Sequence, residues 1–247
     1  MIRTSKEIYK DYSRFYDDYT DDVIDDLVVY NKFITPNDTI LEIGCGTGRV
    51  TLSLLSKNPK KIIGVDTSKE MLDIARKKLK TYILLKKLSL IEHDFSYNNL
   101  IETYNIAFIT YYTINYILTD IENFIANIAT SLSSNGLLVI DCFISDIINN
   151  PELNNMKRVF EPFKSNNHLY FVTDKRILRD DIETRTVIFD DKKGDKVEME
   201  TTRRFYSPNE IERILTNLGF IDIKYSYGYP YSKKLTKGNF IIEARKR

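Results

Sequence analysis

Short apolar runs alternate with amphipathic segments over the first 145 residues of the chain. Five of the apolar runs have the length of buried strands: Ile40–Ile43, KKIIGVD, LSLIEHD, NIAFITYY and LLVIDCFI. Before the last run, apolar residues recur every three or four positions and predict an amphipathic helix that Asn135-Gly136 ends. Alternating strands and helices predict a parallel sheet with helices on both faces.

Further helices are predicted in the first 80 residues. Residues 5–35 have the composition of two helical pieces, rich in tyrosine and acid, that end before Pro36, and Arg49–Lys57 predicts a third helix. Thr67 and Glu70 match a capping box, so we expect Thr67 to cap a fourth helix. The third and fourth helices follow predicted strands, as the parallel fold requires.

The pattern changes after residue 145. The segments LYFVTDKRIL, TRTVIF and VEMETTRRFY predict successive antiparallel strands, with DDKKGD as a hairpin turn. Helical periodicity returns at Ser207, where Pro208 and Glu210 complete the signature of a first turn, and Gly219 is expected to end this helix.

Two final strands, FIDIKYSYGY and NFIIEARK, should be joined by a hairpin-like loop. We therefore expect three parts: N-terminal helices with a nucleotide-binding core over residues 1–144, an antiparallel β insertion over 145–205, and a helix and strand hairpin that complete the core over 206–247.

Three glycines follow the first strand at alternate positions, as Gly44, Gly46 and Gly48 in ILEIGCGTGRV. A dinucleotide fingerprint needs G-x-G-x-x-G, but Arg49 stands where its third glycine belongs. A phosphate-binding P-loop needs G-K-[S/T], which is also missing. Glycines let the backbone approach a ligand closely, and the acid Glu42 before them favours a ligand that carries positive charge.

Acids also end the next two strands. Asp66 could accept hydrogen bonds from both hydroxyls of a ribose, or serve only as an acid at a helix N-terminus. Asp94 could accept from an adenine amine with Phe95 packed near the ring, or be an ordinary strand-end acid. Taken together with the glycines, acids on three successive strands describe a pocket for S-adenosylmethionine.

The chain resembles the class I S-adenosylmethionine-dependent methyltransferases, and within them the bacterial branch that acts on small molecules. The resemblance covers nearly the whole chain and is carried by these segments: YKDYSRFYDD, LEIGCGTGRVTLSLL, IIGVDTSKEMLDIARKKL, LIEHDF, YNIAFITYYTINYILTDIENFIANIATSLSSNGLLVIDCF and RRFYSPNEIERILTNLGF. It implies a Rossmann-like α/β fold, with a seven-stranded sheet whose last strand is antiparallel. Related sequences often carry an Arg-Ser or Asp-Ser segment after strand four, where this chain has TYYTIN instead.

The resemblance also implies cofactor contacts. Backbone around Gly44 and Gly46 would hold the methionine amino group and carboxylate, with Glu42 at the amino end. Tyr16, together with Tyr9 or Tyr12, would close over the methionine tail. The remaining implied contacts are Gly48 in the glycine turn, Asp66 at the ribose, Thr67 and Met71 beside the adenine, and Asp94 and Phe95 at its edge.

Candidate catalytic residues follow strand four, where the sheet edge faces the substrate. Tyr112 and Asn115 are expected there, with Tyr111 beside the cofactor, although ordinary loop packing would also explain all three. Tyr16 is expected to act in catalysis as well as in cofactor binding, by excluding water. Of the two histidines, His93 should line the cofactor site and His168 should lie exposed at a strand start. No metal cluster is predicted, because Asp141 has no second carboxylate at a suitable spacing.

Composition and charge limit the classes of partner and the cell compartment that can be expected for the chain. The 247 residues carry a formal charge of +1, which gives no reason to expect nucleic acid. No apolar run approaches the ~20 residues that span a bilayer, and the N-terminus lacks a signal-peptide core. Cys45 and Cys142 have no metal-site or disulfide pattern. These features predict a reduced, cytoplasmic protein that is a monomer or homodimer.

We therefore predict a methyltransferase that uses S-adenosyl-L-methionine, releases S-adenosylhomocysteine and methylates nitrogen or oxygen of a small metabolite, with the insertion as a substrate lid. One alternative is an RNA or protein methyltransferase, against which the neutral charge and the absence of an RNA-binding module count. The other is a cofactor-binding partner protein without catalytic activity. The identity of the acceptor stays open at this point.

Overall fold

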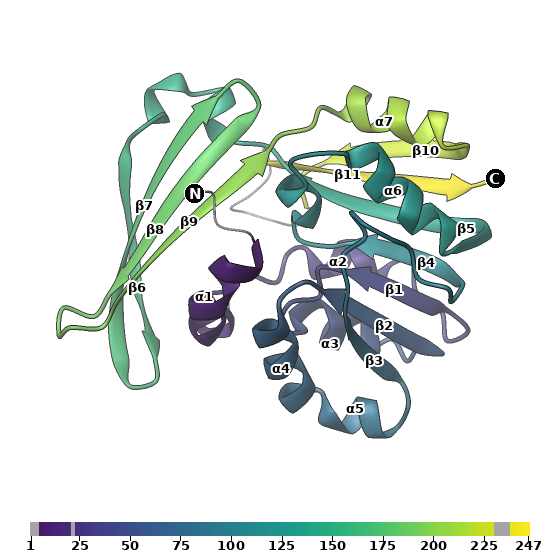
Figure 1. Ribbon diagram of the computed structural model, residues 1–247, viewed down its shortest axis with the longest axis horizontal. Coiled ribbons are helices and arrows are strands. Elements are labelled where there is room, and N and C mark those ends of the chain that lie inside the picture. The colour runs from purple at the N-terminus through teal and green to yellow at the C-terminus, as the bar shows by residue number, and fades with distance from the viewer. Residues whose placement is uncertain (1–4, 21–22, 230–237) are drawn as a thin grey trace.

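The computed structural model describes residues 5–20, 23–229 and 238–247, which form two sheets and the helices around them (Figure 1). The large sheet has the strand order β10-β11-β5-β4-β1-β2-β3. Its strands are β1 (Thr39–Ile43), β2 (Lys61–Asp66), β3 (Leu88–Glu92), β4 (Tyr104–Ile109), β5 (Leu132–Phe143), β10 (Phe220–Tyr227) and β11 (Asn239–Lys246). β11 runs antiparallel to β5 and β10, while β1 to β5 are parallel. The predicted seven-stranded sheet with its last strand antiparallel is confirmed.

Helices cover both faces of the large sheet, because its central strands are apolar on both sides. In β1, Ile40 packs into one buried cluster with α2 and α3, while its neighbour Leu41 packs into another with α6 and α7. A strand buried on both faces needs such a continuous apolar run. The helices are α1 (Ser5–Tyr19), α2 (Leu27–Asn31), α3 (Arg49–Leu55), α4 (Lys69–Lys78), α5 (Lys80–Leu84), α6 (Ile121–Thr130) and α7 (Pro208–Asn217).

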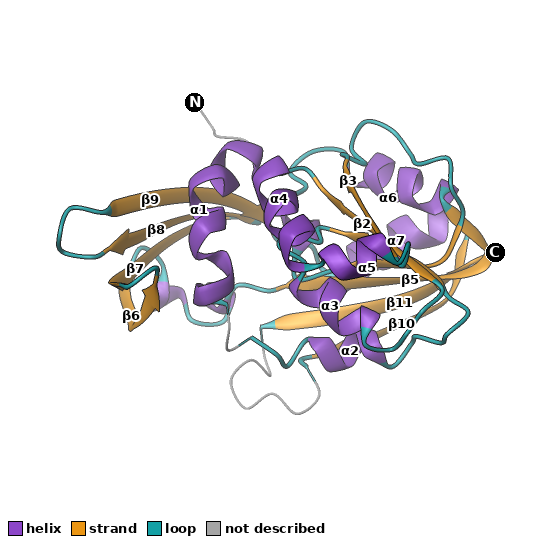
Figure 2. Ribbon diagram, turned by 90° about the horizontal axis from the view of Figure 1, so that it is seen from below, coloured by secondary structure: helices purple, strands orange, loops and turns teal. Residues whose placement is uncertain are grey.

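Four antiparallel strands between Lys157 and Arg204 form a separate sheet, here called the second sheet. They are β6 (Lys157–Ser165), β7 (His168–Arg179), β8 (Ile182–Asp190) and β9 (Lys196–Arg204). Helix α1 lies between this sheet and the core, next to α4 (Figures 1 and 2). Tyr12 and Phe15 of α1 are buried against Tyr170, Val172 and Phe189 of the second sheet. The first segment of the chain thus fastens the second sheet to the core.

Several predicted boundaries need correction. Ser68, and not Thr67, caps α4, because the Ser68 side chain accepts the Met71 N–H while its own N–H donates to Asp66. The helix before β5 ends at Thr130 and β5 begins at Leu132, ahead of the predicted Asn135-Gly136 stop. The sequence patterns missed β6 altogether. Most of the predicted loop between β10 and β11, residues 230–237, lies outside the described residues.

The predicted ends of α7 and the predicted turn of the second sheet agree with the structure. Ser207 caps α7 by accepting the Glu210 N–H, and Gly219 follows the helix with a left-handed φ of 83°. The predicted DDKKGD turn connects β8 to β9. In the described part of the chain, no helix is both long and apolar enough to cross a membrane.

Candidate active site

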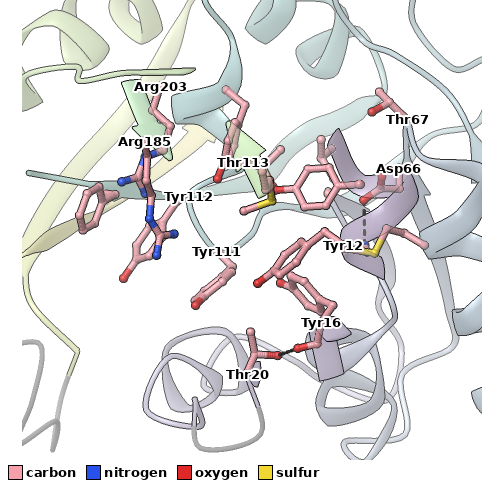
Figure 3. Close-up of a pocket in the computed structure, with 18 of the residues that line it drawn as sticks. Tyr12, Tyr16, Thr20, Asp66, Thr67, Tyr111, Tyr112, Thr113, Arg185 and Arg203 are labelled. Carbon is pink, nitrogen blue, oxygen red and sulfur yellow. Dashed lines mark hydrogen bonds between the residues drawn. The ribbon is translucent and has the colours of Figure 1, made fainter. Parts of the chain in front are cut away.

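A cavity of about 1140 Å³ lies where the carboxyl ends of the core strands face α1 and the second sheet (Figure 3). It exceeds the roughly 300–1,000 Å³ of a typical small-molecule pocket. Most of the predicted cofactor residues line it together: Tyr16, Gly44, Gly46, Asp66, Thr67, Met71, Asp94, Phe95 and Tyr111. Parallel strands place their carboxyl ends at one edge of a sheet, which is why residues from β1, β2 and β3 meet here.

The glycine turn, residues 44–48, is closed by its own hydrogen bonds. The Gly44 N–H donates to Val65 O at 2.8 Å, and the Gly46 N–H donates to Asp66 Oδ2 at 2.8 Å. Since backbone groups seek one partner each, these two amides are already satisfied. Neither amide is therefore left to donate to the methionine carboxylate predicted here, whereas the carbonyl oxygens of the turn suit the predicted amino group.

Glycine is required at the start of the turn. Gly44 has φ 77°, and a Cβ there would lie 1.9 Å from Thr113 Oγ1 in the segment after β4. Gly48 has φ 82°, and a Cβ there would lie 2.6 Å from Leu79. Gly48 does not line the cavity, so the structure gives it a packing role in place of the predicted cofactor contact.

Asp66, at the end of β2, joins two loops. Its Oδ2 accepts the Gly46 N–H and its Oδ1 accepts the Ser68 N–H, both at 2.8 Å. Burial raises the pKa of this carboxyl, while the bonds from Ser68 and Gly46 act against that shift. Each carboxylate oxygen has a second lone pair, so Asp66 can still accept two hydroxyl groups from the cavity.

The acid after β3 has a similar arrangement. Asp94 Oδ1 accepts the Ser96 N–H at 2.8 Å, and Phe95 is buried with its ring edge-on to His93 at 4.6 Å. His93 lines the cavity as predicted, with Nε2 3.0 Å from Asn98 O. This wall offers apolar faces and one carboxylate oxygen, Asp94 Oδ2, that accepts no hydrogen bond from a described residue, which suits a flat heterocycle with an exocyclic amine.

Glu42 lies behind the residues that line the cavity. Its side chain is fully buried, and Oε2 accepts a hydrogen bond from Thr51 at 2.6 Å, whereas Oε1 has no partner among the described residues. Burial raises the pKa of Glu42 to about 7. A buried acceptor without a donor is unfavourable, and one directly before the glycine turn favours a positively charged group bound there.

Tyrosines of α1 form the roof of the cavity. Tyr9, Tyr12, Tyr16 and Tyr19 all line it, and the Tyr16 hydroxyl makes no hydrogen bond to a described residue. The helix is fixed over the glycine turn by Asp17, which accepts hydrogen bonds from Thr47 and from Lys78 at 2.7 Å. The predicted closure of α1 over this edge therefore has a structural basis.

The segment after β4 contributes two strained residues. Tyr111 and Tyr112 both have left-handed φ values, 43° and 65°, a conformation that is unfavourable for bulky side chains and is often found at functional sites. Their rings stack at 4.9 Å, and Arg49 lies over the Tyr111 ring at 4.7 Å. Burial raises the pKa of Tyr111 to about 12, so its phenol stays neutral and keeps a proton that it can donate to a ligand.

Arg49 explains the missing third glycine of the dinucleotide pattern. Its terminal nitrogens donate to both oxygens of the buried Asp26, at 2.8 and 2.6 Å, and to Val23 O at 2.7 Å. Bidentate pairs of this kind are strong and directional. Arg49 therefore holds the segment before α2 against the glycine turn, a task that glycine could not perform.

Asn115 does not have the predicted catalytic position. Its side chain is fully buried outside the cavity lining. It donates to Phe143 O at 3.2 Å and Arg204 O at 2.7 Å, and it accepts the Phe143 N–H at 2.8 Å. With its amide used on backbone of β5 and β9, we assign Asn115 a positioning role, whereas Tyr112 does line the cavity.

A buried network behind Tyr112 was not foreseen. Asp141 accepts hydrogen bonds from Tyr30 at 2.7 Å, Tyr229 at 2.6 Å and Asn239 at 3.3 Å. Burial raises the pKa of Asp141 to about 7. The Tyr30 hydroxyl in turn accepts the Tyr111 N–H at 3.0 Å, so this network supports the strained segment.

Sequence reasoning also missed three cavity arginines, Arg176, Arg185 and Arg203, one from each of β7, β8 and β9. A signal was present, because each lies in strand alternation with buried residues such as Val172, Val187 or Met199. His168 starts β7 half-exposed, as expected, with Nδ1 2.6 Å from Asp191. Among the described residues, no group of three His, Cys, Asp or Glu side chains could hold a metal ion.

Comparison with known proteins gives one family match, a methyltransferase domain, over residues 40–136. The mitochondrial ribosomal RNA small subunit methyltransferase of Arabidopsis thaliana is 38% identical over 69 residues, 28% of this chain and 18% of that protein. A carboxy-S-adenosyl-L-methionine synthase of Alteromonas mediterranea is 26% identical over 199 residues, 77% of this chain and 71% of that protein. The chain spans between 18% and 38% of the length of three curated relatives that it matches.

Solved structures resemble the whole chain. An S-adenosylmethionine-dependent methyltransferase from Clostridium acetobutylicum has a TM-score of 0.75 at 20% identity, covering 96% of this chain and 98% of that one. The sugar N-methyltransferase KedS8 from Streptoalloteichus has a TM-score of 0.74 at 15% identity, covering 96% and 92%. At such identities the likeness establishes the fold, second sheet included.

Proposed function

Because residues 40–136 match a methyltransferase domain and the fold resembles that of S-adenosylmethionine-dependent methyltransferases, we propose that the chain is such an enzyme and that it methylates a nitrogen or oxygen atom of a small metabolite. The observation that carries the proposal is the continuous cavity, which extends from the glycine turn to the second sheet. Its volume has room for two ligands side by side, a cofactor and an acceptor. Relatives of the same fold include sugar and glycopeptide N-methyltransferases.

The residues fit the cofactor. When bound, S-adenosylmethionine supplies a methyl group that is already activated by its sulfonium. Carbonyls of the glycine turn, with the partnerless oxygen of Glu42 behind them, suit an amino group. Asp66 can accept from ribose hydroxyls, while Asp94 and Phe95 suit the adenine edge. Tyr16 covers the site and excludes water.

The chain's contribution to transfer is positioning. The acceptor's lone pair forms the bond to the methyl carbon as the carbon–sulfur bond breaks, and the acceptor atom gives up a proton. Holding the reacting atoms in line can supply roughly 7–11 kcal/mol of the barrier. The buried phenols of Tyr111 and Tyr112, kept neutral by raised pKa values, are suited to orient the acceptor as hydrogen-bond donors.

The test combines binding with turnover. S-adenosylhomocysteine should raise the melting temperature, whereas NAD and ATP should not, because only a ligand of the folded state stabilises it. Labelled S-adenosylmethionine should then transfer its methyl group to a member of a panel of small amines and alcohols. Binding without any transfer, or transfer only to RNA or protein, would refute the small-molecule proposal.

A second candidate is modification of the cofactor itself. It is favoured by the carboxy-S-adenosyl-L-methionine synthase match, which extends over 77% of this chain. The two candidates differ in their products. Mass spectrometry of the spent nucleoside should find S-adenosylhomocysteine if the chain is a methyltransferase, and a carboxylated S-adenosylmethionine if the second candidate is correct.

A further inference from the structure

Three arginines line the end of the cavity that the second sheet forms. Arg176 of β7 and Arg185 of β8 are directly opposite in the strand register, and Arg203 comes from β9. Figure 3 shows Arg185 and Arg203 on the other side of the cavity tyrosines from Asp66 and Thr67. Like charges opposite one another in a sheet are destabilising unless something compensates them.

Among the described residues, the charge compensation of these arginines is incomplete. The fully buried Asp174 accepts from Arg176 Nε at 2.9 Å and from Arg185 Nε at 3.1 Å, so one carboxylate serves two cations. Arg176 also reaches Asp146 at 3.3 Å, but Asp146 already pairs with Arg158 at 2.9 Å.

The third cation has a carboxylate to itself, since Arg203 pairs with the buried Glu183. The seven charged residues of this cluster therefore carry one more positive than negative charge: Asp146, Arg158, Asp174, Arg176, Glu183, Arg185 and Arg203.

Arg185 is the one cation of the three with both terminal nitrogens unengaged among the described residues, since Arg176 and Arg203 each use one. Only its Nε is engaged, and neither terminal nitrogen donates to a described residue. Its side chain is only 18% exposed, so solvent compensates the charge poorly. The acids Asp18, Asp25 and Glu161 also line the cavity, but none of them forms an ion pair with Arg185.

An oxyanion is the ligand that this arrangement fits. A guanidinium presents two parallel N–H groups that match a carboxylate or a phosphate in a bidentate way. A buried cation without a full counter-charge is unfavourable, and a bound anion would remove that penalty. The glycine turn at the other end of the cavity has carbonyls and carboxylates, which would repel the same anion.

We propose that Arg185 is an oxyanion-binding site, and that it anchors a carboxylate or phosphate of the methyl acceptor while the acceptor's nucleophilic atom faces the glycine turn. The role in acceptor binding rests on the proposed function. The anion site itself does not, because it follows from the charges and contacts of the second sheet.

The direct test is titration with inorganic phosphate and with malonate, followed by calorimetry or NMR shifts, with and without S-adenosylhomocysteine. Wild type should bind at least one of the two anions saturably in the millimolar range or tighter, and the tighter one identifies the acceptor's anionic group. Arg185→Met should weaken binding at least tenfold. Arg185→Lys keeps a cation beside Asp174 but loses the two parallel N–H groups of the guanidinium, so it should weaken anion binding at least threefold.

Arg204→Met is the matched control. Arg204 lies on the second sheet beside Arg203 but pairs with Asp181 and Glu210, and it does not line the cavity. Its variant should bind anions within twofold of wild type. The proposal is overturned if wild type binds neither anion, or if Arg185→Lys matches wild type; this second variant decides the matter should Arg185→Met fail to fold.

The acceptor role has its own readout. Matched pairs of acceptors, with and without a carboxylate or phosphate, should show transfer to the anionic member only, and Arg185→Lys should raise KM with little change in kcat. Equal transfer to both members of a pair would overturn the acceptor role. Absence of any S-adenosylhomocysteine binding would instead count against the proposed function, while the anion titration still reports on Arg185.

Discussion

Replacement of Asp66 by alanine separates two roles that the structure gives to one carboxylate. Asp66 clamps the loops after β1 and β2 by accepting the Gly46 and Ser68 amides, both at 2.8 Å. It also lines the cavity, where we propose that it accepts ribose hydroxyls. Asp66→Ala removes both sets of bonds at once, so stability and ligand affinity must be measured separately.

The structure sets the expected magnitudes. A hydrogen bond to a charged group contributes about 1.5–3 kcal/mol, but Asp66 is only partly buried, so water replaces part of both amide bonds. We expect the free energy of unfolding of the ligand-free protein to fall by about 1–3 kcal/mol. Loss of the ribose bonds should weaken S-adenosylhomocysteine binding by a further 2–3 kcal/mol, roughly 30- to 150-fold.

Urea denaturation gives the first quantity and calorimetry with S-adenosylhomocysteine gives the second. Asp73→Ala is the control, because Asp73 pairs with Lys69 and Arg76 on the exposed side of α4 and does not line the cavity. It should change stability and affinity little. If Asp66→Ala is less stable yet binds within twofold of wild type, Asp66 is a loop clamp only and the ribose assignment fails.

Three further results are expected. Tyr16→Phe should leave stability nearly unchanged, because the hydroxyl bonds no described residue, and should weaken cofactor binding or single-turnover rate by about 1.5–3 kcal/mol; wild-type values for both would make Tyr16 a packing residue. Burial raises the pKa of Asp141 to about 7, so native protein holds this proton more tightly than unfolded chain, and stability should fall as pH rises from about 4 to 7. In urea denaturation at a series of pH values, Asp141→Asn should reduce this loss of stability and leave only the contribution of Glu42, whose pKa is also raised. The same pH dependence in Asp141→Asn and wild type would contradict the raised pKa of Asp141. Methyl transfer should survive a chelator, and rescue by magnesium after its loss would show that a metal is needed.

The core and its cofactor edge could be predicted because their signals are local. The strands ILEI and KIIGVD are buried on both faces of the sheet. A strand without a solvent-exposed face needs a nearly continuous apolar run, and such a run can be recognised in the sequence. Once these strands are known to be parallel, the residues that follow them, Gly44, Asp66 and Asp94, must share one edge. The structure places all three around one cavity.

Other features depended on contacts between distant segments. Thr67 and Ser68 are both capable caps, and the choice between them follows from the bond between Asp66 and the Ser68 amide. Asn115 could have faced substrate, but its partners lie on β5 and β9, far along the chain. No local pattern shows which of two polar roles such a residue takes.

The second sheet was predicted only in part. β6 was missed because it is an edge strand that is exposed at most positions, contains Pro162 and has a register shift between Phe160 and Phe163. Its apolar alternation is therefore weak. The arginines were missed for another reason: their strand phase was available, but no local pattern shows that Asp174 and Glu183 are buried beside them.

The position of α1 between the core and the second sheet has a consequence for synthesis. The residues that cover Tyr12 and Phe15 lie in β7 to β9, about 150 to 185 positions later in the chain. At roughly 5–20 residues per second, the ribosome completes β9 some 10–40 s after α1. During that interval α1 carries an aromatic face without its binding partner. Helix α1 can therefore dock on the complete second sheet only after β9 has been made, and chains that terminate before β9 should be substrates for chaperones and proteases.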